Sequence, residues 1–240
     1  MKISEFLDKE LKFTYENDYK NLLEAGFFTK WIYRKSHKAL ESPLPDGLNN
    51  GATILEIAAQ ADQHRQYVSS GWVKYIVSDI DITPLIESNK IHASGENQST
   101  SDVSFEKIDA TDIPYGDSHF DRLIATCLIA HMNEPVDALA EWRRVVKDGG
   151  HLSLYVACEP SILLRIARVL TRKRAPRKSS MDFDLIHYYQ HTISYPAMME
   201  FIKFVFKNDK LSISKYPFRF LPWDLNFWSI VTIKLSKKST

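Results

Sequence analysis

Acidic side chains stand at the ends of three short apolar runs of the sequence. Glu56 lies in the first run, and Asp79 and Asp81 follow the second, 23 and 25 positions later. An acid about 20 residues past the first strand–helix turn of a nucleotide-binding unit accepts hydrogen bonds from ribose hydroxyls. Asp79 and Asp81 are therefore candidate ribose-binding residues, the alternative being solvated loop carboxylates. Asp109, after a third run, is placed to receive an adenine amino group.

Three histidines are candidate general bases, because an unperturbed imidazole titrates near neutral pH. His131 follows a fourth apolar run, where it either faces a ligand or only begins a helix. His187 and His191 are four residues apart, so on a helix they share a face and could ligate a metal ion. No third ligand has a matching spacing, so we expect a substrate-lining or structural role and no metal.

Five β-rich runs alternate with helix-like segments, which predicts a parallel, doubly wound α/β sheet of Rossmann type. The runs span residues 53–57, 73–77, 103–108, 122–126 and 151–156. The clearest helix is predicted over 135–147, with a proline in its first turn and Asp148-Gly149-Gly150 as its terminator. Ligands of open α/β sheets bind beyond the carboxyl ends of the strands, so the candidate acids share one edge.

The flanking regions differ from this core. Residues 1–50 are predicted to form an N-terminal helical cap, 51–157 the Rossmann-like cofactor-binding core, and 158–195 a basic insertion or lid. Residues 196–240 complete the sheet, with a helix over 195–208 and strands over 211–216 and 226–235 that pair as a hairpin at the sheet edge.

Composition excludes several classes of protein. The 240 residues are 44% hydrophobic and 25% charged with a net charge of +1, so neither disorder nor a nucleic-acid partner is indicated. Cys127 and Cys158 are too few for a disulfide scaffold, and we expect both to be small core residues of a cytoplasmic protein. No run approaches the ~18 apolar residues of a membrane span.

Four stretches together resemble the class I S-adenosylmethionine-dependent methyltransferases. They are ILEI at 54–57, Asp79, DATDIPYGDSHFD at 109–121 and EWRRVVKDGG at 141–150, and the resemblance covers about residues 51–157. It implies a seven-stranded sheet with an antiparallel last strand and S-adenosylmethionine as the cofactor. It also implies that Asp79 or Asp81 binds the ribose, while Asp109 and Ala110 contact the adenine.

The turn after the first strand departs from the family pattern. The resemblance places Glu56, Ala58 and Gln60 beside the methionine part of the cofactor, but the family usually carries alternating glycines where this chain has Ala58, Gln60 and Asp62. Glycine serves there because the backbone turns tightly and approaches the cofactor. Either the turn takes another conformation and a side chain supplies the missing contacts, or cofactor binding is weak or lost. His64, beside this turn, is expected to be partly exposed.

Methylation of a small-molecule, glycan or lipid-linked acceptor is the function that the resemblance favours. The alternatives are a pseudo-enzyme that binds another ligand or partner in the same cleft, and an enzyme of this fold with a different reaction. The basic segment 165–178 is either a solvated loop or a basic amphipathic helix that contacts an anionic substrate or lipid head groups, which would allow peripheral membrane contact.

Overall fold

The computed structural model of the chain describes residues 27–42, 44–45, 47–60, 64–86, 102–172 and 188–237. Asp62, His187 and residues 173–178 of the basic segment lie outside these ranges, as does most of the predicted N-terminal cap. Within the described residues, no helix has the length and apolar content needed to cross a bilayer.

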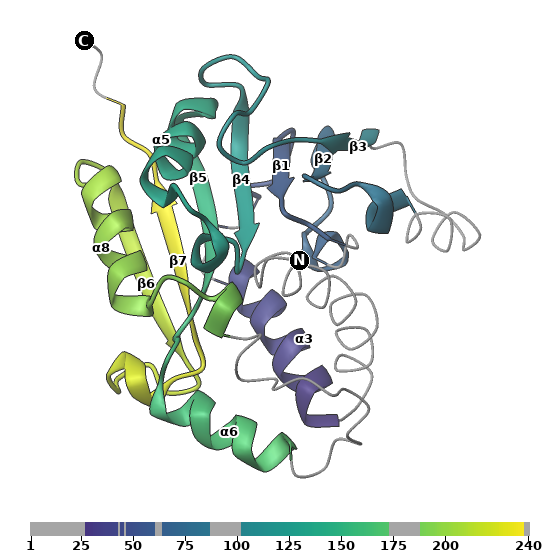
Figure 1. The fold of residues 1–240 in the computed structure, drawn as a ribbon. Coiled ribbons are helices and arrows are strands. Elements are labelled where there is room, and N and C mark those ends of the chain that lie inside the picture. Colours follow the sequence, from purple (N-terminus) through teal and green to yellow (C-terminus); the bar gives the residue numbers. More distant parts are fainter. Residues whose placement is uncertain are drawn as a thin grey trace, which may run out of the picture.

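A seven-stranded sheet in the order β3-β2-β1-β4-β5-β7-β6 forms the centre of the molecule (Figure 1). The strands are β1 (Thr53–Ile57), β2 (Lys74–Asp79), β3 (Asp102–Lys107), β4 (Phe120–Thr126), β5 (Val146–Ala157), β6 (Lys210–Tyr216) and β7 (Trp228–Lys234). β1 to β5 pair in parallel, and β7 runs antiparallel to both of its neighbours. The predicted fold class and the C-terminal hairpin are thus confirmed. The strand order reverses between β1 and β4, which is where open α/β sheets bind ligands.

Helices cover both faces of the sheet. Helices α5 (Pro135–Val145) and α8 (Tyr195–Val205) pack on one face, in a core that contains Trp142 and Ile202. Helices α3 (Phe27–Glu41) and α6 (Ile162–Arg172) contribute Leu40 and Leu163 to the core on the other face. Neighbouring residues of a strand point to opposite faces, so Leu55 joins the first core and Ile54 the second. Both faces of the sheet are therefore buried, as parallel sheets require.

The predicted end of the 135–147 helix is wrong. Helix α5 ends at Val145, and the predicted terminator lies inside β5. The pairing of β4 with β5 moves there from Phe120–Val146 to Arg122–His151, so extra residues bulge out of β5. Gly149 has a φ of 74°, and a Cβ on Gly150 would lie 2.9 Å from the carbonyl oxygen of Asp121. The glycines thus accommodate a bulge rather than a helix end.

Candidate functional site

The turn after β1 lies at the carboxyl edge of the sheet, beside the reversal of strand order. Ala58 and Gln60 both have a φ of 52°, in the left-handed region that favours glycine. The Ala59 amide donates to the Ser78 carbonyl (3.0 Å), and the Ser78 hydroxyl donates to the Glu56 carbonyl (2.9 Å), so the turn is tied to β2. The backbone therefore takes a conformation that favours glycine, although Ala58 and Gln60 carry side chains.

Asp79 stands directly beside this turn, at the end of β2. Its Oδ2 accepts the Gln60 amide (3.0 Å) and its Oδ1 accepts the Asp81 amide (3.1 Å). Asp81 is exposed, and its own carboxylate accepts the Thr83 amide at the start of the helical segment 83–86 (3.0 Å). Of the two candidate ribose acids, Asp79 adjoins the turn and Asp81 faces solvent.

Glu56 is buried beneath the same edge, with 1% of its surface exposed. Tyr75 donates its hydroxyl to Glu56 Oε2 (2.6 Å). Burial, together with the neighbouring carboxylate, raises the pKa of Tyr75 well above its usual value, so Tyr75 stays a donor. Glu56 therefore supports the turn from within the protein.

The loop after β3 is held by local bonds. Asp109 is exposed, and its Oδ1 accepts both the hydroxyl (2.7 Å) and the amide (2.8 Å) of Thr111, which lowers the pKa of Asp109. The carbonyl of Ala110 accepts the indole N–H of Trp142 (2.8 Å). The two residues that the resemblance assigns to the adenine are thus fixed in position by neighbours on the loop and on α5.

His131 and His191 lie together at the carboxyl end of β4, although they are 60 residues apart. Their ring centroids are 4.4 Å apart, and the carbonyl of Gln190 lies 3.1 Å from His131 Nδ1. Cys127 completes a group whose ligand-type atoms all lie within 4.8 Å of one another. Burial, and then the charge of Glu159, raise the pKa of the Cys127 thiol to about 12. Cys158 is buried as predicted, but Cys127 is only half-buried, and its place at this edge was not predicted.

His64 is buried, with 1% of its surface exposed, so its predicted partial exposure is wrong. Its Nε2 donates to Glu41 Oε1 (2.9 Å), and its Nδ1 lies 2.8 Å from Nδ1 of His37. Arg122, fully buried on β4, donates to both oxygens of Glu41 (2.6 and 2.9 Å). The His64 ring can be buried because two polar partners, Glu41 and His37, satisfy its nitrogens. Sequence reasoning missed this network, and the one signal for it is a charged residue within the apolar run of β4.

The network shifts two pKa values. Burial, reinforced by His64, lowers the pKa of His37 to about 3. Burial alone would raise the pKa of Glu41, but hydrogen bonds from His64 and Arg122 overcome that effect and hold it at about 2. At neutral pH Glu41 is therefore an anion paired with Arg122, and His37 is neutral.

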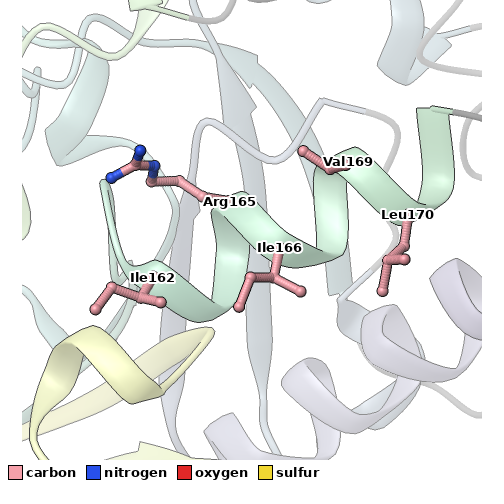
Figure 2. A pocket seen from close by; sticks show the side chains of 5 residues that line it. All are labelled: Ile162, Arg165, Ile166, Val169 and Leu170. Atoms are coloured by element: carbon pink, nitrogen blue, oxygen red, sulfur yellow. The ribbon is translucent and has the colours of Figure 1, made fainter.

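Helix α6 presents an apolar face at the surface. The helix borders a hollow of about 410 Å³. Figure 2 shows the five side chains that line it, Ile162, Arg165, Ile166, Val169 and Leu170. The four apolar side chains are 48–61% exposed. Arg168, on the same helix, forms an ion pair with the buried Glu159. The described part of the basic segment is thus an amphipathic helix with an uncovered apolar face.

Comparisons with known proteins agree with this geometry. Residues 55–154 match the family described as "Methyltransferase domain". The chain is 43% identical over 51 residues to a demethylmenaquinone methyltransferase of Renibacterium salmoninarum, a match that covers 21% of this chain and spans only 22% of that relative. A Thermotoga maritima structure described as a SAM-dependent methyltransferase, possible histamine N-methyltransferase, has a TM-score of 0.61 at 14% identity, over 94% of this chain and 98% of that one. The cyclase SpnF has a TM-score of 0.59 at 15% identity, over 84% of this chain and 80% of that chain.

The architecture is the Rossmann-like fold shared with S-adenosylmethionine-dependent methyltransferases, and residues 55–154, less than half of the chain, match the methyltransferase domain family.

Proposed function

We propose that the chain binds S-adenosylmethionine at the turn after β1 and methylates a small-molecule, glycan or lipid-linked acceptor, with a lipid-linked acceptor favoured. One observation carries the proposal. The turn has left-handed φ values at Ala58 and Gln60, and the Asp79 carboxylate stands 3.0 Å from the Gln60 amide. This combination fits a nucleoside ligand, because a tight backbone turn and a ribose-binding acid meet at the reversal of strand order.

The roles of this chain's residues follow from that placement. When bound, the cofactor supplies a methyl group on a sulfonium. Asp79 would bind the ribose, Asp109 and Ala110 would contact the adenine, and the 58–60 backbone would hold the methionine part. Methyl transfer is an in-line displacement, so alignment contributes much of the rate, and a base is needed only for a weakly acidic acceptor. We propose His131, which is exposed at the end of η3 (Ile129–His131), as that base.

Two observations favour an apolar acceptor. The uncovered face of α6 offers apolar surface, and Arg165 at the same hollow offers a positive charge for an anionic head group. The relative from Renibacterium salmoninarum is named for a demethylmenaquinone substrate, which is in keeping with this choice.

An enzyme of this fold with a different reaction is the second candidate. SpnF shares the fold and is described as a cyclase, so the fold supports more than methyl transfer. The side chain of Gln60, where the family usually has glycine, is the local feature that favours this candidate.

Calorimetric titration with S-adenosylmethionine and with its demethylated product tests the proposal. We expect one site per chain. Asp79→Asn should weaken binding by roughly 10- to 100-fold, because a hydrogen bond to a charged group is worth about 1.5–3 kcal/mol. Asp81→Asn is the matched control and should leave the affinity nearly unchanged, because Asp81 faces solvent.

No heat with either ligand at high concentration, together with an unshifted unfolding midpoint, would overturn the proposal and favour a pseudo-enzyme. Cofactor binding without methyl transfer to any acceptor class would favour the second candidate instead.

A further inference from the structure

We propose that Cys127, His131 and His191 form a binding site for a divalent metal ion of the zinc class. The three residues come from the end of β4, from η3 and from the segment after residues 188–190. One ligand-type atom of each lies within 4.8 Å of the other two. Sequence spacing pairs His191 only with His187, whereas the fold brings it close to Cys127 and His131.

The geometry requires only a small closure. Zinc binds thiolate sulfur at about 2.3 Å and imidazole nitrogen at about 2.0–2.1 Å, so its tetrahedral ligand atoms lie roughly 3.3–3.6 Å apart. Side-chain rotations that bring the three atoms inward by about 1 Å would complete such a site. The backbone already holds the parts together, since the Thr192 amide donates to the Ala130 carbonyl at 3.1 Å.

The hydrogen bond of His131 sets the tautomer that a metal needs. A backbone carbonyl can only accept, so the 3.1 Å contact from Nδ1 to the Gln190 carbonyl places the proton on Nδ1. The lone pair is then on Nε2. A metal-bound histidine usually donates its other ring N–H in this way to a carbonyl or carboxylate, which orients the ring.

The backbone at Cys127 adds an independent observation. Cys127 has a φ of 57°, a conformation that costs a residue with a side chain about 1–2 kcal/mol. Strain of this kind gathers at functional sites, where the surrounding structure maintains it. In this conformation the Cys127 thiol at the end of β4 lies with the two histidines, whereas we predicted that it would lie in the core.

The exposure of the three residues indicates a catalytic rather than a structural type of metal site. His131 is exposed, while Cys127 and His191 are half-buried, so the group opens to solvent on one side. Three protein ligands with one open side are typical of catalytic zinc sites, whereas structural sites have four ligands and are closed. If the chain has the proposed function, the fourth position would bind an oxygen, nitrogen or sulfur atom of the acceptor, and the bound metal, in place of His131 as a base, would activate that atom.

Titration of the full-length, metal-free protein with Co²⁺ tests this site, because a cobalt–thiolate bond gives a charge-transfer band in the near ultraviolet. We expect one equivalent of Co²⁺ to produce the band and Zn²⁺ to displace it. Cys127→Ser should abolish the band. His191→Gln should weaken the affinity by more than the ~10–100-fold typical of losing an outer-shell partner.

Two matched variants are the controls. Cys158→Ser removes the other of the two cysteines, and His119→Gln removes an exposed histidine just before β4; both should keep the band. No band with the unaltered protein, or a band that survives Cys127→Ser, would overturn the proposal. Thermal unfolding of each variant checks that it is folded. Because the titration needs no cofactor, its failure is separate from a failure to bind S-adenosylmethionine.

Discussion

Ala58 and Gln60 hold side chains at backbone positions where a Cβ is unfavourable. The left-handed conformation costs a residue with a Cβ about 1–2 kcal/mol. Replacement by glycine would remove this strain, but glycine loses more backbone entropy on folding, which offsets part of the gain. The turn is therefore a place where stability is lost in this chain relative to a glycine-bearing one.

Substitution by glycine should stabilise the protein at these two positions. We expect Ala58→Gly and Gln60→Gly each to raise the free energy of unfolding by about 0.5–1 kcal/mol, because the strain that is relieved exceeds the cost of the extra backbone entropy that glycine loses on folding. Urea denaturation measures this change. Ala59→Gly is the control. Ala59 is buried and has no positive φ, so replacing it with glycine should destabilise the protein. Equal destabilisation by all three variants would contradict the left-handed turn.

Single residues at this edge were predictable to different degrees. Spacing pointed equally to Asp79 and Asp81, and the position after the third strand pointed to Asp109, because an acid that directly follows a strand can be recognised from neighbouring residues alone. The left-handed φ at Ala58 was not predictable, since alanine disfavours it. The group of Cys127 with His191 was not predictable either, because it depends on how a segment 60 residues further on returns to η3.

At the scale of elements, the buried network joins α3 to the sheet. Glu41 ends α3, Arg122 lies in β4, and His64 precedes η2 (Arg65–Tyr67). Arg122 also donates from Nε to Ser153 of β5 (3.1 Å). A buried ion pair of this kind gives little net stability, but it is costly to break, so it fixes where α3 sits.

The protein should lose stability in mild acid through His37. Its pKa is about 3 in the folded state against 6.5 for an ordinary histidine, so the unfolded chain binds the extra proton first. The stability contributed by keeping His37 neutral is fully present above about pH 6.5 and is lost as the pH falls toward 3. At about pH 5 the loss from this residue is about 2 kcal/mol. The lowered pKa of Glu41 adds a further loss in the same direction below pH 4.5.

Urea denaturation of the unaltered protein and of His37→Gln, at about pH 7.5 and about pH 5, measures this contribution. The variant should be less sensitive to the drop in pH by about 2 kcal/mol. The same substitution at exposed His119 should leave the pH dependence unchanged. If His37→Gln retained the full acid loss, the burial of a neutral His37 would be contradicted.

Elements were predicted better than their ends. The apolar runs located β1 to β5 and the hairpin of β6 with β7, because burial on both faces leaves continuous apolar segments. The end of α5 was misplaced by two residues, since a glycine pair serves a helix end and a strand bulge equally well. Only the pairing of β4 with β5 separates the two roles.

At the scale of the whole molecule, α6 presents exposed apolar side chains together with Arg165 at one hollow of the surface (Figure 2). Under the proposed function, this helix would lie at the surface of a membrane with its apolar face in the head-group region. This arrangement would bring the molecule to an acceptor that is itself anchored in lipid.

Sedimentation with anionic phospholipid vesicles tests this membrane contact. Ile166→Asp should weaken association by roughly 10- to 100-fold, because burial of such a side chain is worth about 1.5–3 kcal/mol. Phe204→Asp is the control, since Phe204 is 67% exposed on α8, which covers the other face of the sheet. Absence of vesicle binding by the unaltered protein, or an equal effect of both substitutions, would contradict the membrane contact.

The position of β7 determines when the sheet can close during synthesis. β7 lies between β5 and β6, and six of its seven residues are buried. The ribosome completes β5 at residue 157 but reaches the end of β7 only at residue 234, roughly 4–15 seconds later at ordinary rates of translation. During that interval the edge of β5 is unpaired, and an unpaired apolar edge invites association with other chains. The nascent protein is thus most prone to aggregation after its five parallel strands are made and before its last strand arrives.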